Sequence, residues 1–340
     1  MSTETTTRRF LLGSYTPDGP APGVHLAERS ADGRWRIVAS ATATNPSFVA
    51  RSGDLAFAVE EHASGSVVSF RLDGDAIERV SAVEHGEADP CHVAVASQQG
   101  VVLVANYTAG SITAVPVSAA GELGTPVTLV LPPGSGPVAD RQEAPHAHEI
   151  VATPWGTHVV SDLGTDAVHE FAVERDGEQV ALRITRTLDV PPATGPRHMV
   201  VRGGLLHVVG ELDGRLHTFE IDAKEFRQGR VESVVGQPPA GDDDVVQPSH
   251  LDLAPAGRLL TALVRGRDSV SVFDATDPER PRLASEHPIG AAWPRHHAHL
   301  DDRTVVVAAQ LGDALVEVDL VTGEARRVLE LRAPSCVLPL

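Results

Sequence analysis

One short motif recurs seven times along the chain and restricts the folds that this sequence can adopt. In each copy a proline follows a residue that is in most cases small or polar, and precedes two residues and an apolar stretch. The prolines lie 40 to 55 residues apart, at Pro46, Pro90, Pro145, Pro196, Pro248, Pro294 and Pro334. A propeller blade of four β-strands repeats every 40 to 50 residues or so. The motif therefore predicts seven blades.

Each of the first six copies is followed by two apolar strands around a tight polar turn. Examples are residues 55–67, 101–112 and 157–168, whose turns contain Gly, Ser or Asp. Val-rich runs of this kind are typical of β-hairpins, and no stretch of the sequence is convincingly helical. An all-β fold follows.

The seventh copy lacks its hairpin, because only four residues follow Cys336. A matching hairpin begins the chain, at residues 9–26. We therefore predict one domain over residues 1–340, a seven-bladed β-propeller with four antiparallel strands per blade, in which Met1–Leu26 and Ala333–Leu340 share a blade. Such closure removes the exposed strand edge of an open ring. Two packed β-domains would not place the halves of one repeat at opposite ends of the chain.

This architecture brings two sets of residues to one mouth of the central channel. The motif begins the innermost strand of each blade and the hairpin turn ends the second strand, so antiparallel pairing places both on one face. The innermost strands supply His92, His146, His148, Arg197, His198, His250, Arg295 and His296. The turns supply His62, Tyr107, Leu163, Glu211, Arg265 and Gln310. Arginines and histidines around a pit predict a site for a small anion in an otherwise acidic protein.

Several of these segments resemble the lactonase family of seven-bladed propellers, which includes the cycloisomerase-type 6-phosphogluconolactonases and the 3-carboxy-cis,cis-muconate lactonizing enzymes. The resemblance covers essentially the whole chain. Its motifs are Pro145-His146-Ala147-His148, Gly195-Pro196-Arg197-His198, Gly210-Glu211-Leu212, Arg265-Gly266 and Gly134-Ser135-Gly136-Pro137 leading to Arg141-Gln142. It implies a catalytic set of His148, Glu211, Arg197 and Arg265. The chain departs from the family pattern at Gly210, where the family has Asn, and at Leu263-Val264, where it has Ser-Asn.

The resemblance implies an enzyme that hydrolyses a small anionic lactone of the sugar-acid type, with or without a phosphate. Glu211 or His148 would deprotonate a water, while arginines hold the anion of the substrate and the charge that develops on the carbonyl oxygen. In the alternative, a muconate-type cycloisomerase, the same pair would move a proton beside a carboxylate. Neither reaction needs a metal or an organic cofactor. The residues expected to bind substrate are His92, Tyr107, His146, His198, His250, Arg295, His296 and Gln310.

Composition argues against several other classes of protein. A net charge of −18 at pH 7 disfavours nucleic acid and anionic membranes as partners. No apolar run reaches the roughly 18 residues of a membrane span, and Phe10-Leu11-Leu12 is too short for the core of a signal peptide, so we expect a cytoplasmic protein. Two cysteines make no disulfide framework, and no Gly-x-Ser-x-Gly elbow is present. Oligomeric state stays open.

Two further hypotheses concern metals and protein partners. The pairs His146/His148 and His297/His299 each share a strand face and could bind a metal, but no carboxylate or cysteine joins them at ligand spacing, so we predict no metal site. A propeller can also be an interaction platform without enzymatic activity. Such surfaces present apolar and aromatic anchors, whereas aromatic residues make up only 4% of this chain. An enzyme is therefore the favoured prediction.

Overall fold

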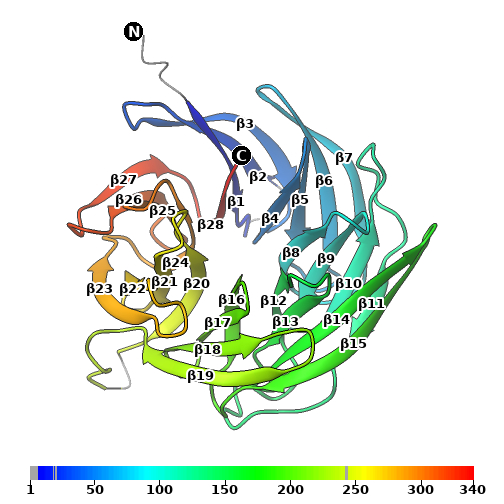
Figure 1. Ribbon diagram of the computed structural model, residues 1–340. Helices are drawn as coiled ribbons and strands as arrows, with labels where there is room; N and C mark the ends of the chain where they lie inside the picture. The colour runs from blue at the N-terminus through cyan, green and yellow to red at the C-terminus, as the bar shows by residue number, and fades with distance from the viewer. Residues whose placement is uncertain (1–6, 18, 20, 242–243) are drawn as a thin grey trace.

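The computed structural model describes residues 7–17, 19, 21–241 and 244–340. Figure 1 shows its sheets arranged as a ring of blades around a common axis, and the described residues form seven sheets of four antiparallel strands each. No described residue is helical, so that part of the chain contains no helix able to cross a membrane. The predicted seven-bladed β-propeller is confirmed.

In blades 1 to 6 the strands follow the chain outward from the axis. Blade 1 holds β4 (Val49–Ser52), β5 (Leu55–Glu60), β6 (Ser66–Asp73) and β7 (Ala76–Glu84). Blade 2 holds β8 (Pro90–Ala96), β9 (Val101–Asn106), β10 (Ser111–Pro116) and β11 (Val127–Val130). Blade 3 holds β12 (Ala147–Ala152), β13 (His158–Asp162), β14 (Ala167–Asp176) and β15 (Gln179–Asp189). Blade 4 holds β16 (Pro196–Arg202), β17 (Leu205–Gly210), β18 (Arg215–Ile221) and β19 (Phe226–Ser233).

The remaining three blades complete the ring. Blade 5 holds β20 (Gln247–Leu253), β21 (Leu259–Arg265), β22 (Ser269–Asp274) and β23 (Arg282–Pro288). Blade 6 holds β24 (Pro294–His299), β25 (Thr304–Ala309), β26 (Ala314–Asp319) and β27 (Ala325–Glu330). Blade 7 holds β28 (Pro334–Pro339), β1 (Arg8–Ser14), β2 (Ala21–Arg29) and β3 (Trp35–Ala43).

Blade 7 joins the two ends of the chain, as predicted. Its innermost strand β28 pairs with β1 from Phe10↔Pro339 to Ser14↔Pro334, and the C-terminus lies beside β1 in Figure 1. The blade extends past Leu26, because its outermost strand is β3. Of the segment Met1–Leu26, residues 1–6, 18 and 20 lie outside the described residues. The closing ladder pairs the inner edge of β1 with β28, so blade 7 has its full set of four strands.

The apolar core lies between neighbouring blades, because each sheet buries both faces against the next sheet. One cluster joins Leu103 and Ile112 of blade 2 to Val160 and Phe171 of blade 3. Phenylalanines in the third strands are fully buried and recur in four blades, at Phe70, Phe171, Phe219 and Phe273. This layer of large side chains fills the space that widens between blades away from the axis.

A β-bulge follows the start of the innermost strand in six of the seven blades of the described chain. In blade 4 the ladder passes from Pro196↔Gly210 to Met199↔Val208, so Arg197 and His198 face a single residue of β17. The other bulges lie in blades 2, 3, 5, 6 and 7. A bulge changes the direction in which a side chain points. Two consecutive residues of each motif therefore reach the channel at different depths.

Aspartates in left-handed turns tie each of several blades to the start of the next. Asp268 and Asp313 have φ of 50° and accept hydrogen bonds of 2.8 Å from the backbone N–H groups of Trp293 and Ala333, respectively. Aspartate tolerates positive φ better than most residues, which explains its use at these turns. In these blades the start of the innermost strand, where the candidate site lies, is thereby held in place by the preceding blade.

Candidate active site

Seven residues at the ends of the second strands form one ring at a mouth of the channel; six come directly after their strand, and Arg265 is the last residue of β21. They are Tyr15, Glu61, Tyr107, Leu163, Glu211, Arg265 and Gln310. The N–H of Glu211, for example, donates to the carbonyl of Gly195 at 2.9 Å, just ahead of β16, and the equivalent bond recurs in other blades. The sequence prediction of His62 for blade 1 was one residue out of register, because β5 ends at Glu60 and Glu61 takes this place.

A second ring comes from the residue at each of the six bulges of the innermost strands and from Ser47, its equivalent just ahead of β4 in blade 1, where the described ladder has no bulge. Its members are Ser47, Cys91, His148, Arg197, Ser249, Arg295 and Ser335. In blade 3 the residue at the level of the other prolines is Ala147, which pairs with Asp162. His148 therefore corresponds to Arg197, and His146 lies outside this ring.

Both rings contribute to a cavity of about 370 Å³ at this mouth. The described residues line it with four arginines and three carboxylates, together with His148, Tyr107, Thr108 and Cys91. The charged members are Arg141, Arg197, Arg265, Arg295, Glu61, Asp89 and Glu211. Cationic side chains are thus in excess here, although the whole chain carries a net charge of −18. Such a cavity favours a small anion.

Three arginines converge on the carboxylate of Glu211, whose side chain is almost fully buried. Its Oε2 lies 2.5 Å from Nη2 of Arg265 and 2.8 Å from Nε of Arg197. Its Oε1 accepts a hydrogen bond of 2.5 Å from Nη2 of Arg141. Burial alone would raise the pKa of Glu211, but Arg265 and Arg197 outweigh burial and hold that pKa below its usual range. Glu211 is a carboxylate at neutral pH.

His148 supplies a neutral imidazole beside this cluster. Burial, followed by the charge of Arg197, holds the pKa of His148 well below its ordinary value, while Glu211 acts in the opposite direction. The ring packs edge-on against Tyr107, with ring centroids 5.6 Å apart. An uncharged imidazole has one nitrogen with a free lone pair, so His148 can accept a proton.

Arg197 and Arg265 are held by backbone carbonyl groups, and Arg265 also by an aromatic side chain. Arg197 donates through Nη1 to the carbonyl of Ser249, and Arg265 donates through Nε to that of Gln247 at 3.3 Å. The guanidinium of Arg265 also lies 5.4 Å from the centre of the Trp293 ring. Carbonyl groups of blade 5 thus fix both side chains before any ligand arrives, which is the preorganisation that a catalytic site requires.

A second group of charges lies on the other side of the cavity. Arg295 donates to the hydroxyl of Tyr15 at 2.7 Å, and that hydroxyl donates to Glu61 at 3.0 Å. Burial raises the pKa of Tyr15, so its hydroxyl stays protonated. Burial also raises the pKa of the Cys91 thiol, which disfavours a thiolate nucleophile at this mouth.

Six of the residues expected to bind substrate do not line the cavity. His92, His198, His250 and His296 each come one residue after the member of the second ring in their strand and form a deeper layer in the channel, because consecutive residues at a bulge point to different depths. His146 stacks behind Tyr107, with centroids 4.4 Å apart, because blade 3 starts its strand two residues after Pro145. Gln310 belongs to the first ring, at the end of the second strand of blade 6, but does not line the cavity. Tyr107 and Arg295 do line it, as expected.

Arg141 reaches the cavity from a loop rather than from a blade. It follows β11 and lies near Gln142, whose fully buried amide donates to the carbonyl of Leu163 at 2.9 Å and accepts from the N–H of Val138 at 3.1 Å. The buried amide anchors the loop to blade 3 and so positions Arg141 over Glu211. The match at Arg141-Gln142 was the one signal in the sequence that pointed to this loop.

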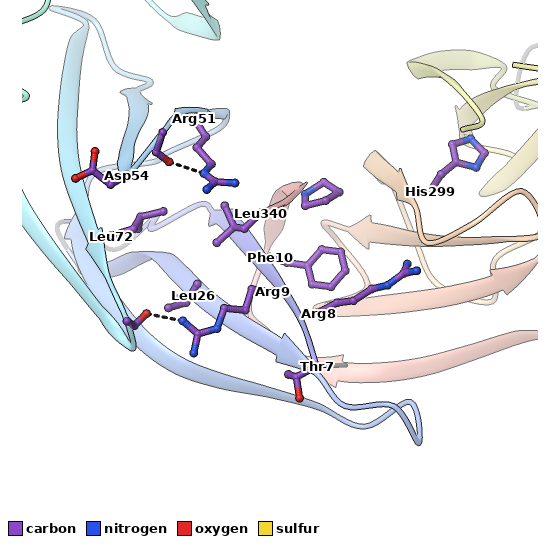
Figure 2. Close-up of a pocket in the computed structure, with 13 residues that line it drawn as sticks. Thr7, Arg8, Arg9, Phe10, Leu26, Arg51, Asp54, Leu72, His299 and Leu340 are labelled. Carbon is purple, nitrogen blue, oxygen red and sulfur yellow. Dashed lines mark hydrogen bonds between the residues drawn. The ribbon is translucent and has the colours of Figure 1, made fainter. Parts of the chain in front are cut away.

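A larger cavity of about 680 Å³ lies at the opposite face of the propeller, where the innermost strands end (Figure 2). Its arginines are occupied: Arg9 pairs with Glu28 and Asp75, and Arg51 donates to the carbonyl of Gly53 at 2.7 Å. Much of its wall is apolar and includes Phe10 and Leu340. It offers no acid–base pair next to free cationic groups, so the smaller cavity is the candidate active site.

The fold and the cavity together define a propeller with a preorganised cationic site for a small anionic ligand. Residues 9–339 match the family described as "Lactonase, 7-bladed beta-propeller". The chain therefore belongs to the lactonase family of seven-bladed β-propellers. A 6-phosphogluconolactonase of Bacillus subtilis is 30% identical over 276 residues, which span 77% of this chain and 76% of that protein.

Solved structures show the same architecture. A putative 6-phosphogluconolactonase of Bacteroides fragilis superimposes with a TM-score of 0.89 at 23% identity, covering 100% of this chain and 99% of that one. A periplasmic gluconolactonase of Pseudomonas aeruginosa has a TM-score of 0.88 at 25% identity, covering 98% and 99% of the two chains. The likeness extends over every blade.

Proposed function

We propose that this protein hydrolyses a phosphorylated sugar lactone of the 6-phosphogluconolactone type. The observation that carries the proposal is the convergence of Arg141, Arg197 and Arg265 on one buried carboxylate, next to the neutral imidazole of His148. A phosphate or a developing oxyanion can replace that carboxylate as the partner of an arginine. The names of the B. subtilis and B. fragilis relatives support the same substrate class.

The charge states of the two acid–base candidates give them different roles. Glu211 is a poor base, because its arginine partners stabilise the ionised form. Burial and the charge of Arg197 also lower the pKa of His148, but an anionic substrate bound to Arg197 opposes the second of these effects. The uncharged imidazole then takes the proton of a water molecule, whose oxygen attacks the carbonyl carbon of the lactone. The carboxylate of Glu211 stabilises the imidazolium that results, as its effect on the pKa of His148 already indicates.

The ester bond between the carbonyl carbon and the ring oxygen then breaks. The ring oxygen leaves with the proton that His148 had taken and becomes a hydroxyl group. Arg197 and Arg265 stabilise the negative charge that forms on the carbonyl oxygen, and Arg141, the most exposed of the three arginines around Glu211, holds the phosphate. At neutral pH the acid product ionises, so each turnover releases one proton.

A pH-stat assay of lactones tests this proposal. We expect the highest kcat/KM for 6-phosphogluconolactone, a lower value for unphosphorylated gluconolactone, and no turnover of 3-carboxymuconate followed by ultraviolet absorbance. EDTA should leave the rate unchanged. If no lactone were hydrolysed faster than in buffer, the proposal would fail and a binding platform would become the better hypothesis; turnover of the muconate alone would favour the cycloisomerase.

A further inference from the structure

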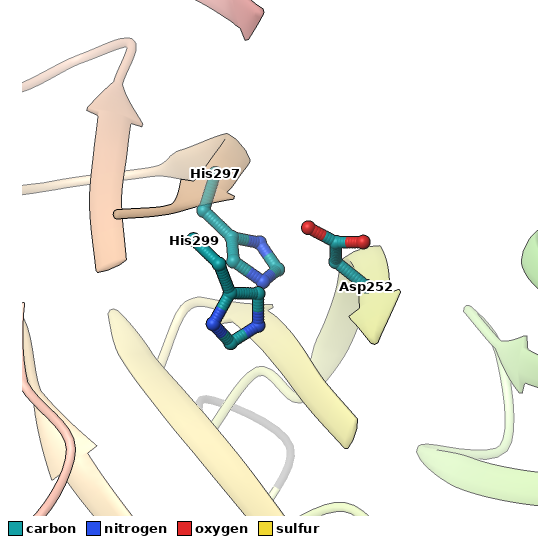
Figure 3. Close-up of side chains that lie close together, drawn as sticks. All are labelled: Asp252, His297 and His299. Carbon is teal, nitrogen blue, oxygen red and sulfur yellow. The ribbon is translucent and has the colours of Figure 1, made fainter. Parts of the chain in front are cut away.

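The channel holds a second polar cluster, at the end opposite the candidate active site. Figure 3 shows His297 and His299 from β24 and the carboxylate of Asp252 from the neighbouring strand β20, which turns toward them. One ligand atom from each of the three lies within 4.8 Å of the other two. His299 comes four residues after Arg295 in β24. At the usual strand rise of about 3.3 Å per residue, the cluster therefore ends about 13 Å from Arg295 at the mouth.

The two imidazoles direct their Nε2 atoms toward a common point. Both atoms lie beside the hydroxyl of Thr261, at 2.7 Å for His297 and 2.8 Å for His299. The opposite ring nitrogens have partners of their own: Nδ1 of His299 donates to the carbonyl of Asp301 at 3.3 Å, and Nδ1 of His297 lies 3.0 Å from Nδ1 of His250. Histidine ligands of metals are oriented in this way, by a hydrogen bond at the nitrogen that does not bind the metal.

The carboxylate of Asp252 lacks a cationic partner among the described residues. It forms no ion pair there, and it accepts one hydrogen bond, from the N–H of Leu253 at 2.8 Å. Glu149 is a second buried carboxyl group of the channel, and the charge of Asp252 acts on it. Uncompensated carboxyl groups among neutral imidazoles favour a bound cation.

We propose that Asp252, His297 and His299 form a structural site for a divalent transition metal, with Zn²⁺ as the best match. Two imidazole nitrogens and one carboxylate oxygen are a common zinc ligand set, and the Thr261 hydroxyl or a water can supply the fourth position. Ligand atoms around tetrahedral zinc are about 3.3 Å apart, since each bond is about 2.0–2.1 Å long. A closure of about 1.5 Å at most therefore assembles the site, and the partly exposed His299 at the end of β24 can provide it.

This site links blades 5 and 6 and takes no part in the lactone chemistry. The sequence prediction of no metal rested on the lack of a carboxylate near the His297/His299 pair. The carboxylate is 45 residues away from His297 in the sequence, and only the packing of adjacent innermost strands brings it close. Zinc bound there stabilises the folded ring, because the three ligands come together only in the native state.

Zinc titration of the full chain, without a polyhistidine tag and after EDTA treatment and dialysis, tests the proposal. We expect one Zn²⁺ per chain by calorimetry and elemental analysis. The Tm should rise by about 3–6 °C at a free zinc concentration of roughly 100 times Kd. Lactone turnover should not change, which also distinguishes this site from zinc bound at the candidate active site.

Three variants locate the metal. Asp252→Asn and His299→Gln should each weaken zinc binding by more than about 100-fold, beyond the 10- to 100-fold effect of losing an outer partner. The control is His287→Gln. His287 lies on β23 and its imidazole contacts the carbonyl of Leu320, outside the proposed site. This variant should bind zinc as the wild type does. Asp252→Asn preserves shape, so it decides the matter if His299→Gln does not fold. Uptake of less than half an equivalent by the wild type, or a wild-type Kd in Asp252→Asn, would overturn the proposal.

Discussion

Two buried glutamates of the same channel differ in their ionisation. Glu211 lies in the ring at the mouth and contacts three arginines, which hold its pKa below the usual range. Glu149 lies in the deeper layer, where burial raises its pKa well above the usual range and its close partner is His198, 3.1 Å away and itself neutral. Burial is similar, so the number of cations in contact decides the charge.

The same contrast extends to the histidines and arginines of the two layers. At the mouth, arginines and carboxylates are charged and paired with one another. An arginine there can exchange its carboxylate partner for an anionic ligand. In the deeper layer His250 and His296 stack with centroids 3.7 Å apart, and burial lowers the pKa of His296 to about 3. A layer of neutral rings packs like an apolar core. The propeller therefore uses one set of strands for a reactive ring and, one residue further on, for a supporting layer.

The largest expected effect is the difference in kcat/KM between variants of the two glutamates. Glu211→Gln should lower kcat/KM by about 10²–10³, because three arginines lose the charge that orients them. Glu149→Gln, the matched control, should stay within about twofold of the wild type, because burial favours the uncharged form of the native side chain, which glutamine resembles. Initial rates in the pH-stat assay measure both. Equal losses in the two variants would erase the distinction between the layers.

Replacement of an arginine at the mouth should have a smaller and more selective effect. Arg265→Ala should lower kcat/KM by about 10- to 100-fold, mainly through kcat, because Arg265 stabilises the charge that develops on the carbonyl oxygen with one or two charge-assisted hydrogen bonds. Arg265→Lys should recover only part of this loss, since an ammonium group cannot form the bidentate contact. Steady-state kinetics on the best lactone give both numbers. Full recovery by lysine would show that only the charge of Arg265 is needed.

The smallest expected effect concerns the pH dependence of stability. The folded pKa of Glu149 lies above its unfolded value, so the folded state binds more protons. Its contribution to stability is therefore present at low pH and is lost as the pH rises from the ordinary carboxyl range toward the raised pKa. Glu149→Gln removes this contribution, and its Tm should fall less steeply with pH than that of the wild type.

Melting curves between pH 4 and 8 in EDTA measure this difference in slope. Asp252, whose pKa is also raised, is present in both proteins, and its coupling to Glu149 is part of the difference that is measured. Arg197 and the neutral His92 and His198 face Glu149 in both proteins as well. Parallel curves would mean that Glu149 is ionised in the folded protein, like Glu211.

Much of the fold could be predicted from the sequence, because the same four-stranded unit recurs seven times. Seven prolines mark the innermost strands, and the split of the last repeat identifies the strand that closes the ring. The repeat also placed Arg197, Glu211 and Arg265 at one mouth, since the start of the first strand and the end of the second must share a face. These predictions needed only the period and the antiparallel pairing.

Depth within the channel could not be predicted in this way. A bulge adds one residue without a mark in the sequence, so His198 and its equivalents could not be separated from Arg197 and its ring. Blade 3 adds two residues after Pro145, which displaced His146. The third arginine on Glu211 comes from a loop outside the repeat, and Asp252 meets His297 only across two blades. Contacts between elements of different repeats need the structure itself.

The closing ladder between β1 and β28 also determines the order in which the protein can be completed. A ribosome makes β1 first and β28 last, and about 320 residues separate them. At about 5–20 residues per second, the inner edge of β1 waits roughly 15–65 s for its partner. During that time the nascent chain presents an unpaired strand to its surroundings. Until β28 emerges, that edge of β1 is open to pairing with a neighbouring chain.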